Sequence, residues 1–398
     1  MSKAEPRWKR HCRFLAALND DNVSLAWTLL CGREGPPVDP DIRIMTGGEY
    51  KPAICIAVER DLLEMAELLI MRGCSVNQFA PTGLSPLHIA VMRNNIAMVH
   101  LLLKSGASVS CRDSSGRTPL HHLAVCNYSD GSLEIAKLLV QKGSKTEHRD
   151  GSGATPLALA CQGHRDLALY LLSLGANAGA ADNEGDTPLH HACTKLPNDE
   201  ELVMQLLAAG VRVNKKNNRG MTALSLAVLA HASPAVVQSL MSNGADCNLY
   251  IKCWNQTVLH RAICIANHSR DWESVKTFVR YGGNPFGQDR TGTTVMQYAM
   301  CTNKPLALWM IRANPFMGAP RWYAWRVLCG GSYSLTDEFN ESMTSELSSV
   351  PKLQRLCSLA FRAKYARHLN SPAYTSALPP RLLQHLHLSN LWPMGMDW

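Results

Sequence analysis

Apolar residues recur along this chain in pairs of short runs that polar turn residues separate. In one pair, the first run carries Leu189 and Ala192, and the second carries Leu202 and Leu206 before Gly210. Positions three and four residues apart share one side of a helix, so each run predicts a short helix with one apolar face. Two such helices cannot bury these faces alone, whereas a stack of similar pairs buries them as one continuous core.

A short phrase, Gly185-Asp-Thr-Pro-Leu-His190, opens these pairs. The Gly suits a turn with positive φ, the Thr hydroxyl can cap a helix, and the Pro fits the first helical position. Further copies begin at Gly83, Gly116, Gly153 and Gly220. The position of the Pro recurs with a period of about 33 residues. It is occupied by Pro52, Pro86, Pro119, Pro156 and Pro188, and then by Ala223, Val258 and Val295.

The phrase and its period resemble those of an ankyrin-repeat array. We therefore expect an all-α solenoid of about eight helix-turn-helix repeats joined by hairpin loops, over residues 50–330. Its last copies are degenerate, with a final second helix over Asn303–Ala313 and a closing helix over Trp322–Leu328. Residues 1–31 are expected to form an N-terminal helical cap, with a helix pair over Phe14–Cys31. Residues 32–49 and 331–349 read as linkers because Gly, Pro and polar residues dominate them.

The segment 350–391 is basic and leucine-rich, with two helix-like runs that each follow a proline. In the first run Leu353, Cys357 and Phe361 are four residues apart and share a face. The second run begins at Leu378-Pro379. Residues 392–398 form a tail with no recognised counterpart.

This segment resembles a SOCS box, a small three-helix element. The resemblance implies that the first helix binds elongin C and that the second element binds the cullin-5 scaffold. The matching elongin positions are Leu353, Leu356, Cys357 and Phe361. The matching cullin positions are Leu378, Pro379, Leu382 and Leu386.

An ankyrin array followed by a SOCS box is the layout of the ankyrin-repeat and SOCS-box family. This resemblance implies a non-catalytic, substrate-recognition adaptor of an elongin–cullin–RING ubiquitin ligase. Its partners would be elongin B, elongin C, cullin-5 with its RING-box protein, and a target protein held by the array. An ankyrin scaffold or inhibitor without a ubiquitin role stays open, because Ser358 stands where the family has Arg, and Ser376-Ala377 where it has Leu-Pro.

Composition and charge narrow the class of protein further. The chain has 398 residues, 46% of them hydrophobic and 18% charged, as is ordinary for a folded soluble protein. The net charge is +8, and we read its basic ends as solvated, with no nucleic-acid partner. The start of the chain does not resemble a secretory signal, and no long apolar run predicts a membrane span. A cytoplasmic protein, with nuclear presence also compatible, is expected to keep its 14 Cys reduced.

Candidate chemical sites are few. His121-His122 and His190-His191 suggest zinc, but adjacent helical residues point about 100° apart, and the usual Cys and His ligand spacings are missing. No nucleotide-binding or hydrolase motif is present, so we expect no cofactor, no metal and no catalytic residue. Target binding is assigned to Lys215, Lys216, Arg219 and Trp254, since Arg and Trp are enriched in binding hot spots. The other hairpin-tip residues, such as Arg112, Asp113, Arg149, Asp150 and Asp182, are expected to be solvated turn residues.

Overall fold

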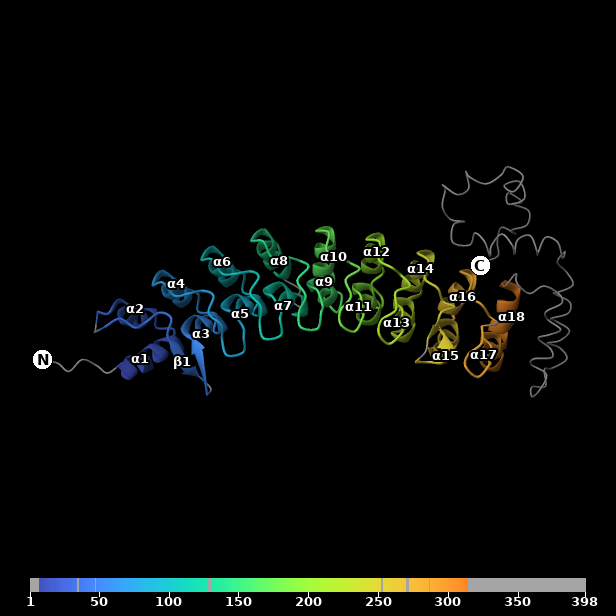
Figure 1. Cartoon of the computed structure of the whole chain (residues 1–398), viewed down its shortest axis with the longest axis horizontal. Helices are drawn as coiled ribbons and strands as arrows, with labels where there is room; N and C mark the ends of the chain where they lie inside the picture. The colour runs from blue at the N-terminus through green and yellow to red at the C-terminus, as the bar shows by residue number, and fades with distance from the viewer. Residues whose placement is uncertain are drawn as a thin grey trace, which may run out of the picture. The chain divides into compact units, whose positions relative to one another are not determined.

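The computed structural model describes residues 7–33, 36–46, 48–126, 131–251, 253–269, 272–285 and 287–313. The chain divides into two compact units, residues 1–196 with 208–211, and residues 197–207 with 212–398. The described parts are helix-rich, and in each unit the helices alternate between two rows (Figure 1). The predicted closing helix and everything expected beyond it lie outside the described residues. No described helix is long and apolar enough to cross a membrane.

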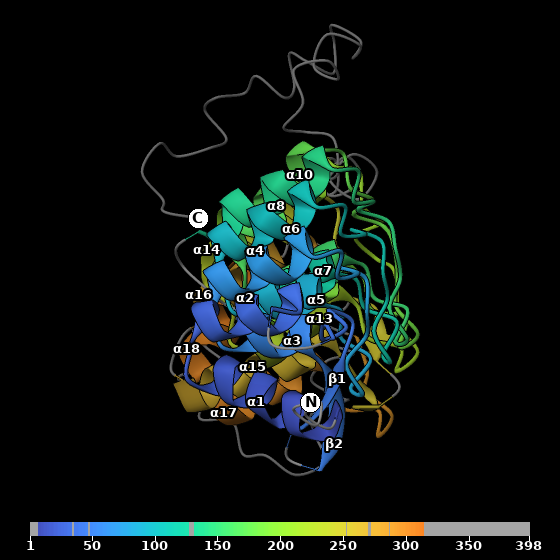
Figure 2. The same ribbon diagram turned by 90° about the vertical axis from the view of Figure 1, so that its left-hand side faces the viewer.

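The first unit stacks its helices repeat by repeat. The first helices of successive repeats, α3, α5, α7, α9 and α11, pack against one another, and the second helices α4, α6, α8 and α10 pack beside them. In Figure 2 the loops between these repeats gather on one side of the helices. The helices are α1 (Arg7–Asn19), α2 (Val23–Cys31), α3 (Ala53–Glu59), α4 (Leu63–Met71), α5 (Pro86–Met92), α6 (Ile96–Lys104), α7 (Pro119–Val125), α8 (Ser132–Gln141), α9 (Pro156–Ala160), α10 (Arg165–Ser173) and α11 (Pro188–Lys195).

The second unit has the same alternation. Here α13, α15 and α17 pack in order, and α14, α16 and α18 form the neighbouring row. The helices are α12 (Glu200–Ala208), α13 (Ala223–Leu229), α14 (Pro234–Ser242), α15 (Val258–Ser269), α16 (Glu273–Arg280), α17 (Val295–Thr302) and α18 (Lys304–Ala313). A short antiparallel pair, β3 (Tyr250–Ile251) with β4 (Gln256–Thr257), precedes α15.

The repeated phrase starts the first helices in the way its chemistry predicts. Thr155 caps α9 by accepting a hydrogen bond from the Ala158 N–H, and Pro156 is the first helical residue. Copies without Pro still start a helix, since Thr294 caps α17 through the Gln297 N–H. The hydroxyl cap therefore survives where the proline is lost, and the late repeats keep their first helices.

The core runs between the two helical rows. Leu102, Leu139 and Leu171, one from each of three successive second helices, are fully buried. Leu120 and Leu123 of α7 are equally inaccessible from the first-helix row. Each repeat therefore buries its apolar faces against its neighbours, as the sequence pattern predicts.

The N-terminal region differs from the expectation in two respects. The first helix begins at Arg7, well before Phe14, and buries Phe14 and Leu18. The stretch expected to be a linker contains β1 (Arg43–Thr46), which pairs antiparallel with β2 (Glu49–Pro52). The sequence analysis did not predict this pair, because the residue types of the segment are typical of a loop. The two strands are defined by their pairing across a turn, which composition does not show.

Candidate protein-interaction surface

Five of the described hairpin turns between repeats are each closed by one inward-turned Asp or Asn. In the first unit, the Asp113 N–H donates to the Arg117 carbonyl at 2.9 Å. Asp113 Oδ1 accepts from the backbone N–H groups of Ser115 and Arg117, both at 2.8 Å. The corresponding residues Asp150, Asp182, Asn217 and Asp289 accept backbone N–H groups in the same way.

These acidic residues are therefore not the solvated turn residues that the sequence predicted. Asp150 is only 8% exposed. Burial alone would raise the pKa of the Asp113 carboxyl, but hydrogen bonds from Arg117 and His122 lower it below its usual value. The sequence could not show that these carboxylates are engaged. The presence of Asp in a turn is compatible both with a carboxylate that faces solvent and with one that closes the turn.

The second carboxylate oxygen of each tip Asp binds a residue on the following or preceding element. Asp113 Oδ2 lies 2.8 Å from His122 Nε2, and Asp182 Oδ2 lies 3.0 Å from His191 Nε2. In the intervening repeat, Arg117 Nε lies 3.2 Å from Asp150 Oδ2 and joins two neighbouring hairpins. The second His of each His-His pair thus holds its own hairpin, which explains its position without any metal.

His121, the first His of the His121-His122 pair, joins one repeat to the next. His121 Nδ1 accepts from the Thr118 N–H at 3.1 Å, and Nε2 lies 3.1 Å from the His148 carbonyl. Burial lowers the pKa of His121 and of His88 to about 4, so both rings are neutral at pH 7. Across the described part of the chain, no group of His, Cys, Asp and Glu is arranged to hold a metal ion.

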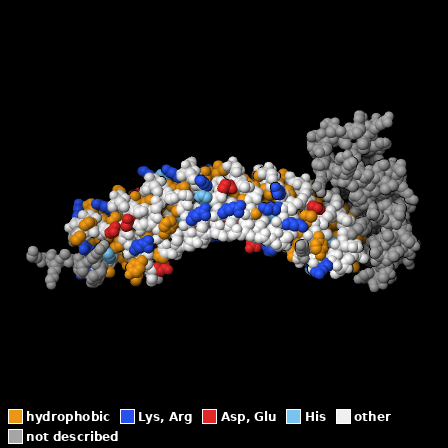
Figure 3. All heavy atoms as spheres, in the orientation of Figure 1, with side chains coloured by type: hydrophobic (Ala, Val, Ile, Leu, Met, Phe, Trp, Pro, Cys, Tyr) orange, Lys and Arg blue, Asp and Glu red, His pale blue; other side chains and the backbone are white. Residues whose placement is uncertain are grey.

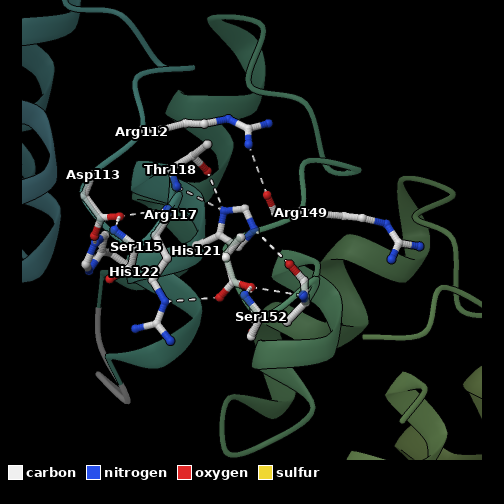
Figure 4. A network of polar contacts seen from close by, with 12 residues as sticks. Arg112, Asp113, Ser115, Arg117, Thr118, His121, His122, Arg149 and Ser152 are labelled. Carbon is white, nitrogen blue, oxygen red and sulfur yellow. Dashed lines mark hydrogen bonds and ion pairs between the residues drawn. The ribbon is translucent and has the colours of Figure 1, made fainter. Parts of the chain in front are cut away.

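Neighbouring hairpins of the first unit are tied together in series (Figure 4). The Gly151 N–H donates to the Ser115 carbonyl at 2.7 Å, and the Asn183 N–H to the Ser152 carbonyl at 2.9 Å. Two arginine side chains also donate hydrogen bonds from one hairpin to the next along the chain. Arg112 Nη1 donates to the Arg149 carbonyl at 3.2 Å, and Arg149 Nη1 to the Ala181 carbonyl at 2.7 Å. The exposed edge of these hairpins is therefore held in place by hydrogen bonds from backbone N–H groups and arginine side chains to the backbone carbonyls of neighbouring hairpins.

The residues that the sequence assigned to target binding lie on two successive turns of the second unit. Lys216 and Arg219 are exposed beside the turn that Asn217 closes, and Lys215 is half-buried. Trp254 is half-buried between β3 and β4, with the Arg261 guanidinium 5.9 Å from its ring. Cys253 Sγ lies 3.7 Å from Met221 Sδ and connects the two turns. Their role in binding stays a prediction.

A basic cluster on the first unit was not singled out from the sequence. It comprises Arg112, Lys145, His148 and Arg149, of which Arg112, Lys145 and Arg149 are exposed. Figure 3 shows Lys and Arg side chains recurring along the face that it presents. One sequence feature could have identified this cluster. Arg112 and Arg149 each directly precede the Asp that closes a hairpin.

A cavity of about 610 Å³ lies at the N-terminal end, between α1 and the loop that follows α2. Arg10 and Arg72 line it together with Asp39 and three prolines. Arg10 Nη1 donates to the Pro36 carbonyl. Its charges are mixed, so the lining does not define one class of ligand.

The predicted elongin and cullin positions, from Leu353 to Leu386, lie outside the described residues. The described residues define a protein-interaction array made of helix pairs and ordered hairpins. A family model for ankyrin repeats in three copies matches residues 14–113, 54–150, 106–182 and 174–251. These matches span more than half of the chain, which therefore belongs to the ankyrin-repeat family. No match was found among curated protein sequences.

Proposed function

We propose that this protein is the substrate-recognition adaptor of an elongin–cullin–RING ubiquitin ligase. The supporting observation is the order of two features along one chain. An ankyrin-repeat array comes first, and the Leu353-x-x-Leu356-Cys357 pattern with its following Leu378-Pro379 element comes after it. Ankyrin repeats mediate protein–protein interaction, so the array is the part that holds a target.

The adaptor would act by proximity and would carry no catalytic residue. Leu353, Leu356, Cys357 and Phe361 would place compact apolar groups in a groove of elongin C, as amphipathic helices do in such complexes. Leu378, Pro379, Leu382 and Leu386 would dock cullin-5 with its RING-box partner. A target bound to the array then meets the activated ubiquitin at a high effective concentration.

Co-expression with elongins B and C tests the first contact. The full chain is expected to co-purify with both elongins, and Leu353→Pro combined with Cys357→Phe is expected to abolish this. Ser358→Ala, within the same predicted helix, is the matched control and should leave co-purification unchanged. Recovery of the wild-type chain free of elongins would contradict the proposal.

A second arm tests the cullin contact separately. Leu378→Ala with Pro379→Ala is expected to lose cullin-5 while keeping both elongins. If neither elongins nor cullin-5 bind the wild-type chain, the scaffold or inhibitor function remains as the alternative. Ser358 and Ser376-Ala377 are the sequence features that favour that alternative.

A further inference from the structure

Two exposed arginines on neighbouring hairpins are fixed in position without being neutralised. Arg112 and Arg149 each donate to a backbone carbonyl of the next hairpin, at 3.2 and 2.7 Å (Figure 4). A carbonyl is neutral, and within the described ranges no carboxylate forms an ion pair with either guanidinium. A guanidinium has five N–H donors, so each arginine retains donors for a second partner.

Lys145, which adds a third positive charge, and the ring of His148 lie beside this pair. His148 is half-buried, and its pKa is lowered by burial and then by the positive charges of Arg112 and Lys145. The hydrogen bond from Arg112 to the Arg149 carbonyl places the Arg112 guanidinium next to this loop, one residue from His148. The same positive potential that disfavours a proton on His148 favours an anion at this place.

The acidic groups nearby are already engaged. The carboxylates of Asp113 and Asp150 close their own hairpins and bind His122 and Arg117. Glu147 is exposed, but its Oε1 accepts from the Asn177 N–H at 3.0 Å, in the next loop of the unit. Neither Asp113 nor Asp150 therefore pairs with Arg112 or Arg149, whose guanidinium groups stay available to a partner.

We infer that Arg112, Lys145, His148 and Arg149 form a recognition site for an extended acidic segment of a partner protein. The chemistry recognised is a row of oxyanions, either side-chain carboxylates or phosphates. Guanidinium groups bind both through paired N–H donors. The inference rests on the proposed function only in calling this partner a ubiquitination target, since the binding itself needs no elongin.

The spacing of the arginines sets the spacing of the acidic residues. Packed helices of neighbouring repeats lie roughly 8–10 Å apart, and an extended peptide advances about 3.4 Å per residue. Acidic residues at positions i and i+3 of the segment therefore match Arg112 and Arg149. Because both side chains are held in place before binding, less conformational entropy is lost when the segment docks.

Fluorescence polarisation with the purified full chain tests this inference. The probe is a Gly/Ser-rich peptide of about fifteen residues with four Glu at every third position, and its Gln counterpart is the neutral control. The Glu peptide should bind and the Gln peptide should not. Arg112→Glu with Arg149→Glu is expected to weaken binding at least about tenfold, which corresponds to roughly 1.4 kcal/mol. Equal binding of the two peptides would overturn the inference.

Matched variants distinguish a loss of affinity caused by the site from one caused by net charge or by misfolding. Lys104→Glu with Lys137→Glu reverses two exposed lysines on α6 and α8 and should change affinity less than about twofold. Lys145→Glu removes no described hydrogen bond, so it tests the site without disturbing the hairpins. Arg112→Lys with Arg149→Lys keeps the charge but loses the paired donors, and should bind with intermediate affinity. An affinity that follows net charge alone, whichever pair is changed, would contradict a specific site.

Two additional probes identify the source of the anions. A peptide with phosphoserine in place of Glu distinguishes a phosphorylated segment from a permanently acidic one, and either result supports the site. A single-stranded oligonucleotide of matched charge is the competing macromolecule. If it binds more tightly than both peptides, the inference of a protein segment fails. Elongin co-purification is measured separately, so failure here leaves the proposed ligase function standing, and the reverse also holds.

Discussion

Asp113 and His122 meet side chain to side chain, with Oδ2 of the carboxylate 2.8 Å from Nε2 of the ring. The other carboxylate oxygen closes the hairpin by accepting two backbone N–H groups. One side chain thus fixes the turn and joins it to the helix that follows. Asp182 and His191 repeat this arrangement, and Tyr298 donates to Asp289 from the same helical position at 3.2 Å.

Removing such an Asp should destabilise the array, and Asp150 offers the sharpest comparison. Asp150→Ala leaves the N–H groups of Ser152 and Ala154 without their acceptor, that of Ala154 being buried, at a cost of about 2–3 kcal/mol. Asp150→Asn keeps an acceptor oxygen, as Asn217 does in its own hairpin. It loses only the attraction to Arg117, so its cost should be about 1 kcal/mol or less. Urea unfolding followed by circular dichroism measures both, and equal costs would contradict this role of Oδ1.

The stability of the first unit should fall as the pH falls from about 6.5 to about 4. In the folded state burial lowers the pKa of His88 and His121 to about 4, whereas in the unfolded chain it is near 6.5. Between these values the unfolded chain binds more protons, so stability present above pH 6.5 is lost on acidification. Each histidine contributes a slope of at most about 1.4 kcal/mol per pH unit.

His121→Gln tests the origin of this slope. Gln297 occupies the same position in its repeat and accepts from the Thr294 N–H through Oε1, so Gln preserves this part of the cap without titrating. The variant should show a shallower fall in melting temperature between pH 7 and pH 5 than the wild type. An unchanged slope would assign the pH dependence to other groups.

Gly83→Ala should be more damaging than Gly106→Ala, although both glycines have positive φ. A Cβ at Gly83 would lie 2.7 Å from the backbone N of Ser114 in the next hairpin, whereas nothing lies within 4 Å of one at Gly106. Both variants carry the backbone cost of about 1 kcal/mol, and only Gly83→Ala also pushes two hairpins apart. Thermal unfolding of the two variants measures the difference, and similar melting temperatures would argue against tight hairpin stacking.

Exposed cysteines should react with an alkylating reagent in the native chain, and buried ones should not. Burial raises the pKa of the Cys193 thiol, and of Cys247, to about 12, and both side chains are inaccessible. Cys12 is exposed on α1. Iodoacetamide at pH 8 should therefore modify Cys12 in the native chain and Cys193 only after denaturation. Peptide mass spectrometry reads out both, and native labelling of Cys193 would contradict the burial of α11.

The repeats were predictable because their determinants are local. The hydroxyl of Thr155, the ring of Pro156 and the apolar residues behind them act within one turn of helix, so a short phrase is enough to start each first helix. The pairing of β1 with β2 was missed, and Asp150 was misjudged as solvated. In both cases the residue types of a turn do not show whether its backbone pairs or where a carboxylate points, and the Arg117 that pairs with Asp150 comes from a neighbouring hairpin.

The sequence by itself determined the helix pairs, their period and the leucine-rich segment that suggests a ligase adaptor. The tertiary structure decided which polar residues are used in holding the hairpins and which remain available. Arg112 reaches the backbone of Arg149 across 37 residues of chain, because stacking of the repeats brings their hairpins side by side. Hydrogen bonds between stacked repeats turn two unremarkable turn residues into a fixed basic surface, and such contacts exist only after the array has folded.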